Sequence, residues 1–192
     1  PVVLGDWQRT VDSKTVWDGM NSILRTVLND EGVALGWTGR GRTELVVHRQ
    51  GVPLNPTIDS LSAGQTGLIN VFGTLLRYGD TSGAGFGVQG VCLIDEVDAH
   101  MHVDLQHRAL PNLMRLFPKV QFIVTSHSPL FVLGMEKAYG AEGVVVLDMP
   151  TGTPIPAEAF AEFGSALAAM RDTVAFSESI AASTSAPGKL LI

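Results

Sequence analysis

The segment that decides the fold is Val91-Cys92-Leu93-Ile94-Asp95-Glu96. A short apolar run of this kind is typical of a strand that is buried on both faces of a parallel sheet. Two adjacent carboxylates are costly to desolvate, so packing does not explain why Asp95 and Glu96 end the run. At the carboxyl end of a parallel strand they would face the crevice where ligands bind. A magnesium ion held by Asp95 and a water molecule activated by Glu96 would account for both.

The rest of the chain alternates between strand-like and helix-like patterns, which predicts βαβ units and a parallel sheet. Apolar spacing of three to four predicts the helices, and short β-branched runs predict the strands. The predicted helices span 15–28, 65–78, 105–117, 129–139 and 157–176. The predicted strands span 33–37, 44–48, 91–94, 120–125 and 143–148, the first two as a hairpin.

Composition places the chain among ordinary globular proteins. It has 192 residues, 45% hydrophobic and 17% charged, which predicts one domain with a proper core. The net charge of −6 argues weakly against a broad nucleic-acid-binding face. Its one cysteine, Cys92, lies in an apolar run and reads as a core residue. No apolar stretch approaches the length of a membrane span. These features predict a cytoplasmic protein without a membrane partner.

A second informative segment is Leu61-Ser62-Ala63-Gly64-Gln65, which stands at the start of a predicted helix. Backbone N–H groups and the helix dipole at such a position favour an anion. The serine adds a hydroxyl donor, and the glycine lets a phosphate approach closely. Ordinary capping of the helix by Ser60 or Ser62 explains the same residues, and taken alone it is the stronger interpretation.

A third segment follows the next predicted strand: Thr125-Ser126-His127-Ser128-Pro129. Parallel strands end at the same edge of a sheet, so His127 would lie beside Asp95 and Glu96. There it could hydrogen-bond a phosphate or hold a water molecule. The alternative is a histidine that caps the turn from strand to helix.

In their order, these three segments resemble the signature, Walker B and switch-histidine elements of ATP-binding-cassette (ABC) ATPases. The run Asp95-Glu96-Val97-Asp98-Ala99-His100-Met101-His102, followed by Gln106 and by residues 116–129, resembles the stand-alone branch of that family. This branch includes the RecF/SMC-like and OLD-type ATPases of DNA repair and phage defence. The resemblance covers roughly residues 55–150. It implies a P-loop NTPase-like α/β fold, specifically the carboxyl-terminal lobe, with a small hairpin near the start.

The resemblance also implies roles and partners. ATP and Mg²⁺ would be sandwiched at a homodimer interface, with Asp95 as the metal ligand. The implied catalytic residues are Glu96 and His127, and the implied ATP-binding residues are Ser62, Gly64, Gln65 and His102. Ala63 departs from the signature, where the family has glycine. A zinc site at His100 and His102, with Asp98 and His107 nearby, is a minor alternative.

The phosphate-binding P-loop is not convincingly present. Gly36-Trp37-Thr38-Gly39-Arg40-Gly41-Arg42-Thr43 nearly fits the motif, but arginine replaces lysine and a strand-like run follows. We interpret it as a hairpin and expect the P-loop in an upstream segment. The chain alone should then bind Mg-ATP weakly and not hydrolyse it.

We therefore expect three parts: a helix and hairpin in 1–54, the ATPase lobe in 55–150, and a helix and linker in 151–192. Lys189-Leu190-Leu191-Ile192 could begin a Toprim-type nuclease domain, and DNA is a possible partner by family analogy. The main alternative is a non-catalytic dimerisation or regulatory module with the same fold. A transporter subunit is less favoured, because the His-x-His pair does not fit it.

Overall fold

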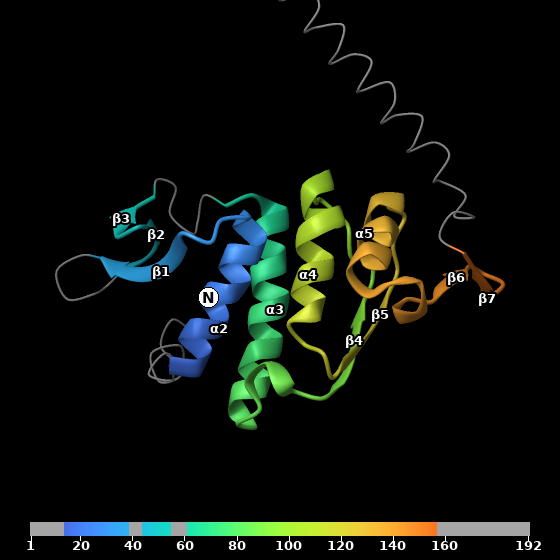
Figure 1. Ribbon diagram of the computed structural model, residues 1–192, viewed down its shortest axis with the longest axis horizontal. Coiled ribbons are helices and arrows are strands. Elements are labelled where there is room, and N and C mark those ends of the chain that lie inside the picture. The colour runs from blue at the N-terminus through green and yellow to red at the C-terminus, as the bar shows by residue number, and fades with distance from the viewer. Residues whose placement is uncertain (1–13, 39–43, 55–60, 157–192) are drawn as a thin grey trace, which may run out of the picture.

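The computed structural model describes residues 14–38, 44–54 and 61–156, which form a mixed α/β arrangement of helices and a parallel strand pair (Figure 1). The predicted fold class is confirmed at this level. Ser60, the predicted helix over 157–176 and the strand-like end at 189–192 lie outside the described residues. Within those residues, no helix is long and apolar enough to span a membrane.

Two long helices, α2 (Lys14–Leu28) and α3 (Ala63–Thr81), lie side by side and carry much of the core (Figure 1). Both were predicted from their apolar spacing, although α3 begins two residues earlier and ends three residues later. Apolar side chains of α2 and α3 meet those of the helices that follow β4. Fully buried members of this core are Ile23, Leu68, Phe72, Leu76, Leu110, Leu113, Met114 and Phe117.

The predicted hairpin is confirmed. Strands β1 (Val33–Thr38) and β2 (Glu44–Arg49) pair antiparallel, and the short β3 (Val52–Pro53) adds to β2. The near-match to a P-loop begins inside β1 and runs into β2, although residues 39–43 are not described. A P-loop needs a helix after it. The segment therefore joins two strands and is not a P-loop.

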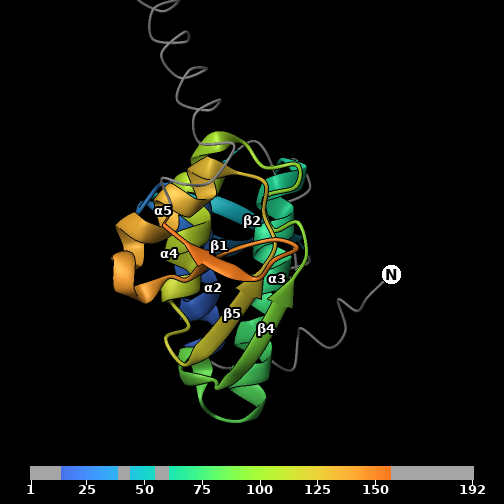
Figure 2. The ribbon, with the colours of Figure 1, turned by 90° about the vertical axis from the view of Figure 1, so that its right-hand side faces the viewer.

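The parallel pair consists of β4 (Gly90–Ile94) and β5 (Val120–Val124), in register from Gly90 opposite Val120 to Ile94 opposite Val124. Between them run a π-helical segment η3 (Leu105–Ala109) and α4 (Leu110–Arg115), and α5 (Pro129–Tyr139) follows β5. Figure 2 shows the two strands in front of α2 and α3. The predicted helix over 105–117 thus exists in two parts.

The prediction that the first strand is buried on both faces is wrong for the described residues. Val91 is 59% exposed, Leu93 is 74% exposed and Ile123 is 52% exposed. Alternate side chains of a strand point to opposite faces. Ile94, Phe122 and their alternating neighbours pack on the core, whereas the other set faces away from every described helix.

The predicted strand over 143–148 is also corrected. Only β6 (Val146–Asp148) is extended, and it pairs antiparallel with β7 (Thr153–Ile155) instead of joining β4 and β5. The Thr151 hydroxyl donates to the Asp148 carbonyl oxygen at 3.0 Å and helps close the turn between these strands. Residues 150–156, expected only to interrupt the chain, therefore form the second half of a hairpin. The predicted loop 79–90 likewise begins later, and it contains the short helix η2 (Gly85–Gly87).

Candidate functional site

The carboxyl ends of β4 and β5 bring the two predicted carboxylates together with a threonine. The Thr125 hydroxyl donates to the Asp95 carboxylate, and it accepts from the Glu96 backbone N–H at 2.7 Å. The backbone also links the two segments, because the Val97 N–H donates to the Thr125 carbonyl oxygen at 3.0 Å. One hydroxyl thus sets the positions of both acidic residues across the strand pair.

Glu96 has a left-handed backbone conformation, with φ at 46°. Only a few per cent of non-glycine residues adopt positive φ, and such residues cluster at functional sites. The Asp95 and Glu96 residues are both exposed, so both carboxylates can be reached from solvent. The sequence motif contained Thr125, but we assigned it no role. Its place directly after the second strand was the available signal.

Two loops meet at this edge, which we call the acidic loop (residues 95–102) and the histidine loop (residues 125–128). His127 is exposed in the histidine loop, whereas Ser128 beside it is 8% exposed. The Ser128 hydroxyl accepts from the Phe131 N–H at 3.2 Å and so caps α5. Ser128, and not His127, is therefore the cap of this helix.

The signature-like segment forms the N-terminus of α3. Ser62 is its cap: its hydroxyl oxygen accepts from the Gln65 N–H at 3.2 Å, and the Gln65 side chain accepts from the Ser62 N–H at 2.9 Å. This reciprocal pair is a capping box. The hydroxyl hydrogen of Ser62 is not used in that bond, so capping leaves a donor for an anion. Ala63 is the first helical residue and has no positive φ, so alanine fits this place without strain.

The signature-like segment also contacts the acidic loop. A Cβ atom added to Gly64 would lie 3.0 Å from the His100 carbonyl oxygen and 3.2 Å from the Met101 Cα. Glycine therefore permits a close approach between the start of α3 and this loop. His100 has φ at 60°, so the loop turns sharply at this contact. His102 is exposed one residue beyond Met101, and its Nδ1 accepts from the Asp104 N–H at 3.4 Å.

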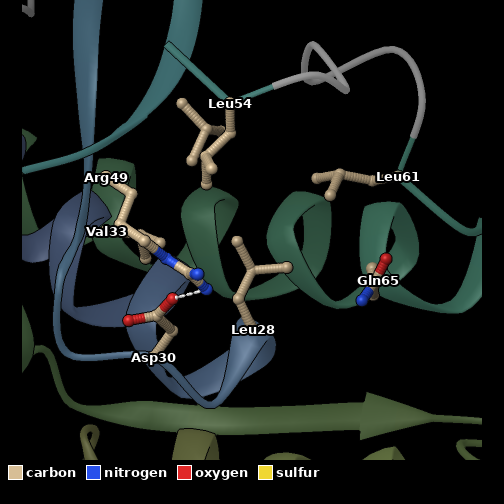
Figure 3. A pocket seen from close by; sticks show the side chains of 8 residues that line it. Leu28, Asp30, Val33, Arg49, Leu54, Leu61 and Gln65 are labelled. Atoms are coloured by element: carbon tan, nitrogen blue, oxygen red, sulfur yellow. Dashed lines mark hydrogen bonds and ion pairs between the residues drawn. The ribbon is translucent and has the colours of Figure 1, made fainter. Parts of the chain in front are cut away.

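Next to this helix start is a pocket of about 240 Å³, drawn in Figure 3. Leu61 and Gln65 line one end, and an ion pair between Asp30 and Arg49 lies at the other. The N–H of Gly32 and the Arg49 guanidinium hydrogen-bond to Asp30, and they hold the pKa of its carboxyl below the usual range. The pocket is separate from Asp95 and Glu96, so no predicted catalytic residue lines it.

The described residues contain no group of three or more His, Cys, Asp or Glu side chains that could hold a metal ion. The zinc alternative at His100 and His102 therefore lacks a ligand set there. Magnesium differs, because it uses one or two carboxylates together with phosphate oxygens and water. The exposed Asp95 carboxylate, oriented by Thr125, offers such an oxygen. The residues present thus fit a nucleotide-bound Mg²⁺.

Comparison with known proteins places these features in a family. Residues 43–133 match the family model described as "AAA domain, putative AbiEii toxin, Type IV TA system". That span contains the start of α3, the acidic loop and the histidine loop. The chain contains an ABC-type ATPase-like domain. The predicted resemblance is confirmed at this level.

Relatives of the ATPase-like domain share a third of its residues. The Septu protein PtuA of Bacillus mycoides (strain KBAB4) is 33% identical over 78 residues, 41% of this chain and 11% of that protein. The "Retron Ec83 probable ATPase" of Escherichia coli is 32% identical over 127 residues, 62% of this chain and 22% of that protein. The chain thus spans less than a quarter of the length of these relatives.

A solved structure also overlaps the chain, with a TM-score of 0.46 and 14% identity. It covers 88% of this chain and 95% of its own, and it comes from work titled "Structural biochemistry of ATP-driven dimerization and DNA stimulated activation of SMC ATPases". Overlap at that level does not establish function. The assignment of the ATPase-like domain therefore rests on the sequence matches.

Proposed function

We propose that this chain supplies the signature, metal-binding and water-activating residues of an ATPase that hydrolyses ATP between two copies of the protein. The observation that carries the proposal is the hydrogen-bonded set of Asp95, Glu96 and Thr125 at the carboxyl ends of β4 and β5. Ligands of open parallel sheets bind at this edge. The sequence matches to proteins named as ATPases support the same conclusion.

Each predicted residue then has a defined task. Asp95 holds Mg²⁺, which would neutralise phosphate charge when bound. Glu96 orients the attacking water and accepts its proton, because its carboxylate is exposed beside Asp95. His127 hydrogen-bonds the γ-phosphate or that water from the neighbouring strand end. These two residues act on the nucleotide of their own copy.

The start of α3 serves the other copy. Its exposed cap residue Ser62 has a free hydroxyl hydrogen, and the helix N-terminus favours an anion. Ser62, Gly64 and Gln65 would close on the phosphates held by the partner, with His102 at the interface. The capping box keeps this helix end in place before nucleotide arrives.

The P-loop must come from elsewhere, and we propose that it lies in a segment upstream of this chain. The uncovered apolar face of β4 and β5 supports this arrangement, because Val91, Leu93 and Ile123 offer a surface for another layer. α/β folds of this type carry helices on both faces of the sheet. The chain would then form the carboxyl-terminal lobe, over residues 55–150, of a longer ATPase.

We place the protein in phage defence. The relatives named for Septu and retron systems support this, as does the family description of a toxin–antitoxin system. DNA, or a Toprim-type nuclease domain that follows residue 192, is the partner that the resemblance to OLD-type proteins implies. Which of these is acted on follows from the whole protein and not from the described residues.

The deciding experiment measures ATP turnover by the longer protein that carries this chain, for the wild type and for Glu96→Gln. Loss of the general base should lower kcat by roughly 10²–10⁴-fold with nucleotide binding retained. Glu142→Gln is the matched control, because Glu142 is exposed in η4 (Ala141–Gly143) and has no assigned task. Undiminished turnover in Glu96→Gln would refute the site. Absence of turnover in the wild type would favour the non-catalytic dimerisation module.

A further inference from the structure

One side chain, Gln106, bonds to both loops of the site. Its Nε2 donates to the Met101 carbonyl oxygen at 2.8 Å and approaches that of Asp98 at 3.5 Å. Its Oε1 accepts from the Ser128 hydroxyl at 2.5 Å. Because backbone carbonyls only accept, the amide must face them with its nitrogen, and this leaves its oxygen for Ser128. The orientation of the amide is thereby determined.

The two ends of this bridge lead to residues with proposed tasks. On one side, Met101 and His100 contact Gly64 at the start of α3, so the bonded part of the acidic loop touches the signature-like segment. On the other side, Ser128 directly follows His127 and caps α5. Gln106 is therefore placed between the elements proposed to contact two different nucleotides.

The local backbone supports this placement. Gln106 lies in the π-helical segment η3, and its N–H donates to the His102 carbonyl oxygen at 3.2 Å. Single π turns within α-helices are rare and occur frequently at functional sites. Gln106 is partly buried, and so is its bond to Ser128. A partly buried bond with two well-matched partners holds its loops more firmly than an exposed one.

We propose that Gln106 is a positioning residue that couples the acidic loop to the histidine loop, so that the signature-like segment and His127 shift together. The proposal rests on the proposed function for its consequence in turnover, but the coupling itself is a property of the described residues. A nucleotide bound at His127 would thereby influence the surface that the start of α3 presents to the partner copy. Without Gln106 each loop would respond alone.

Two variants separate the bonds of the bridge. Gln106→Leu removes both bonds at similar side-chain size. Gln106→Glu keeps an acceptor for Ser128 but, as a carboxylate, cannot donate to Met101. Gln121→Glu is the matched control, because Gln121 is exposed on β5 and takes part in none of these bonds. Circular dichroism establishes that each variant is folded.

Hydrogen exchange measures the coupling without any need for activity. The N–H groups of Ala99 and Met101 donate within the acidic loop at 2.9 and 3.2 Å, and so they report its opening. Exchange in the acidic loop should rise about tenfold in both Gln106 variants, the effect of one lost hydrogen bond. Exchange in the histidine loop should rise only in Gln106→Leu. Exchange equal to that of Gln121→Glu in both loops would overturn the proposal.

Turnover provides the second readout. In the longer protein, Gln106→Leu should lower kcat by about tenfold or more with little change in KM for ATP, because positioning and not ground-state binding is lost. Ser128→Ala should resemble it, and Ser128→Thr, which restores a hydroxyl, should recover most of kcat. A full kcat in Gln106→Leu beside a collapsed kcat in Glu96→Gln would overturn the coupling and leave the ATPase proposal standing. An inactive wild type would refute the ATPase proposal, and exchange would still decide the coupling.

Discussion

Gly134 in α5 packs directly on the backbone of the segment that carries Gln106. A Cβ atom at this position would lie 2.2 Å from the His107 carbonyl oxygen, 2.8 Å from its carbonyl carbon and 3.0 Å from its Cα. All three are backbone atoms, so no flexible side chain can move aside. Pro111, four residues after His107, has no N–H to donate to that carbonyl. Gly134→Ala should therefore force α5 away from η3.

The size of the effect follows from two opposing terms. Non-bonded heavy atoms prefer about 3.5 Å, so relief of the contact requires a shift of about 1 Å between packed backbones. Overpacking of this kind costs about 3 kcal/mol at the upper end of its usual range. Alanine returns about 1 kcal/mol of helix propensity relative to glycine. We therefore expect Gly134→Ala to lower the free energy of unfolding by about 2 kcal/mol.

The same substitution at Gly67 should have the opposite sign. Gly67 lies inside α3, and a Cβ atom there would meet nothing within 4 Å. Gly67→Ala should gain helix propensity without a clash and stabilise the protein by about 0.5–1 kcal/mol. Urea unfolding followed by circular dichroism compares the two variants. With a slope of about 2 kcal/mol per M, the midpoint should fall by about 1 M for Gly134→Ala and rise slightly for Gly67→Ala. Equal shifts of one sign would refute the steric reasoning.

Three further predictions concern other parts of the chain. Ser62→Ala should cost about 1 kcal/mol of stability through loss of the capping box, whereas Ser62→Asn, which can still cap, should retain most of it in the same urea assay. Phe72→Ala should cost about 3–5 kcal/mol because Phe72 is fully buried, and thermal unfolding without a large drop in Tm would contradict the assigned core. The Arg108 side chain hydrogen-bonds to Asp104 and lowers the pKa of its carboxyl, so this pair stabilises the fold above the unfolded pKa and the contribution is lost as pH falls through the lower folded pKa. Asp104→Asn should therefore cost at most about 1 kcal/mol at neutral pH and nothing at acidic pH, and an equal cost at both would contradict the charge pairing.

Local periodicity was enough to predict much of the fold. The helices α2 and α3, the β1–β2 hairpin and the strands β4 and β5 were predicted near their observed bounds, because each depends on a pattern within one segment. The meeting of Asp95 with the residues after β5 was also expected, since parallel strands end at one edge. The roles assigned to Glu96, His127 and the other site residues stay predictions.

The residues that hold the site together were not predicted from the pattern. Thr125 bonds to Asp95 across 30 positions of the chain, and Gln106 bonds to Ser128 across 22. No spacing rule connects residues so far apart. Ser128 and Thr125 lay in a motif that drew attention to His127, and Gln106 was noted only as part of a resemblance. Their roles became visible through hydrogen bonds.

The sequence by itself determined the local elements, the acidic ending of β4 and the capping signal at Ser62, because these depend on residues close together along the chain. Only the tertiary structure decided which face of the β4–β5 pair is covered, and it left Val91 and Leu93 exposed. It also turned β6 away into a hairpin with β7. Burial and strand pairing depend on which distant segments are present to pack against, and an apolar run reads the same whether or not its partner layer is there.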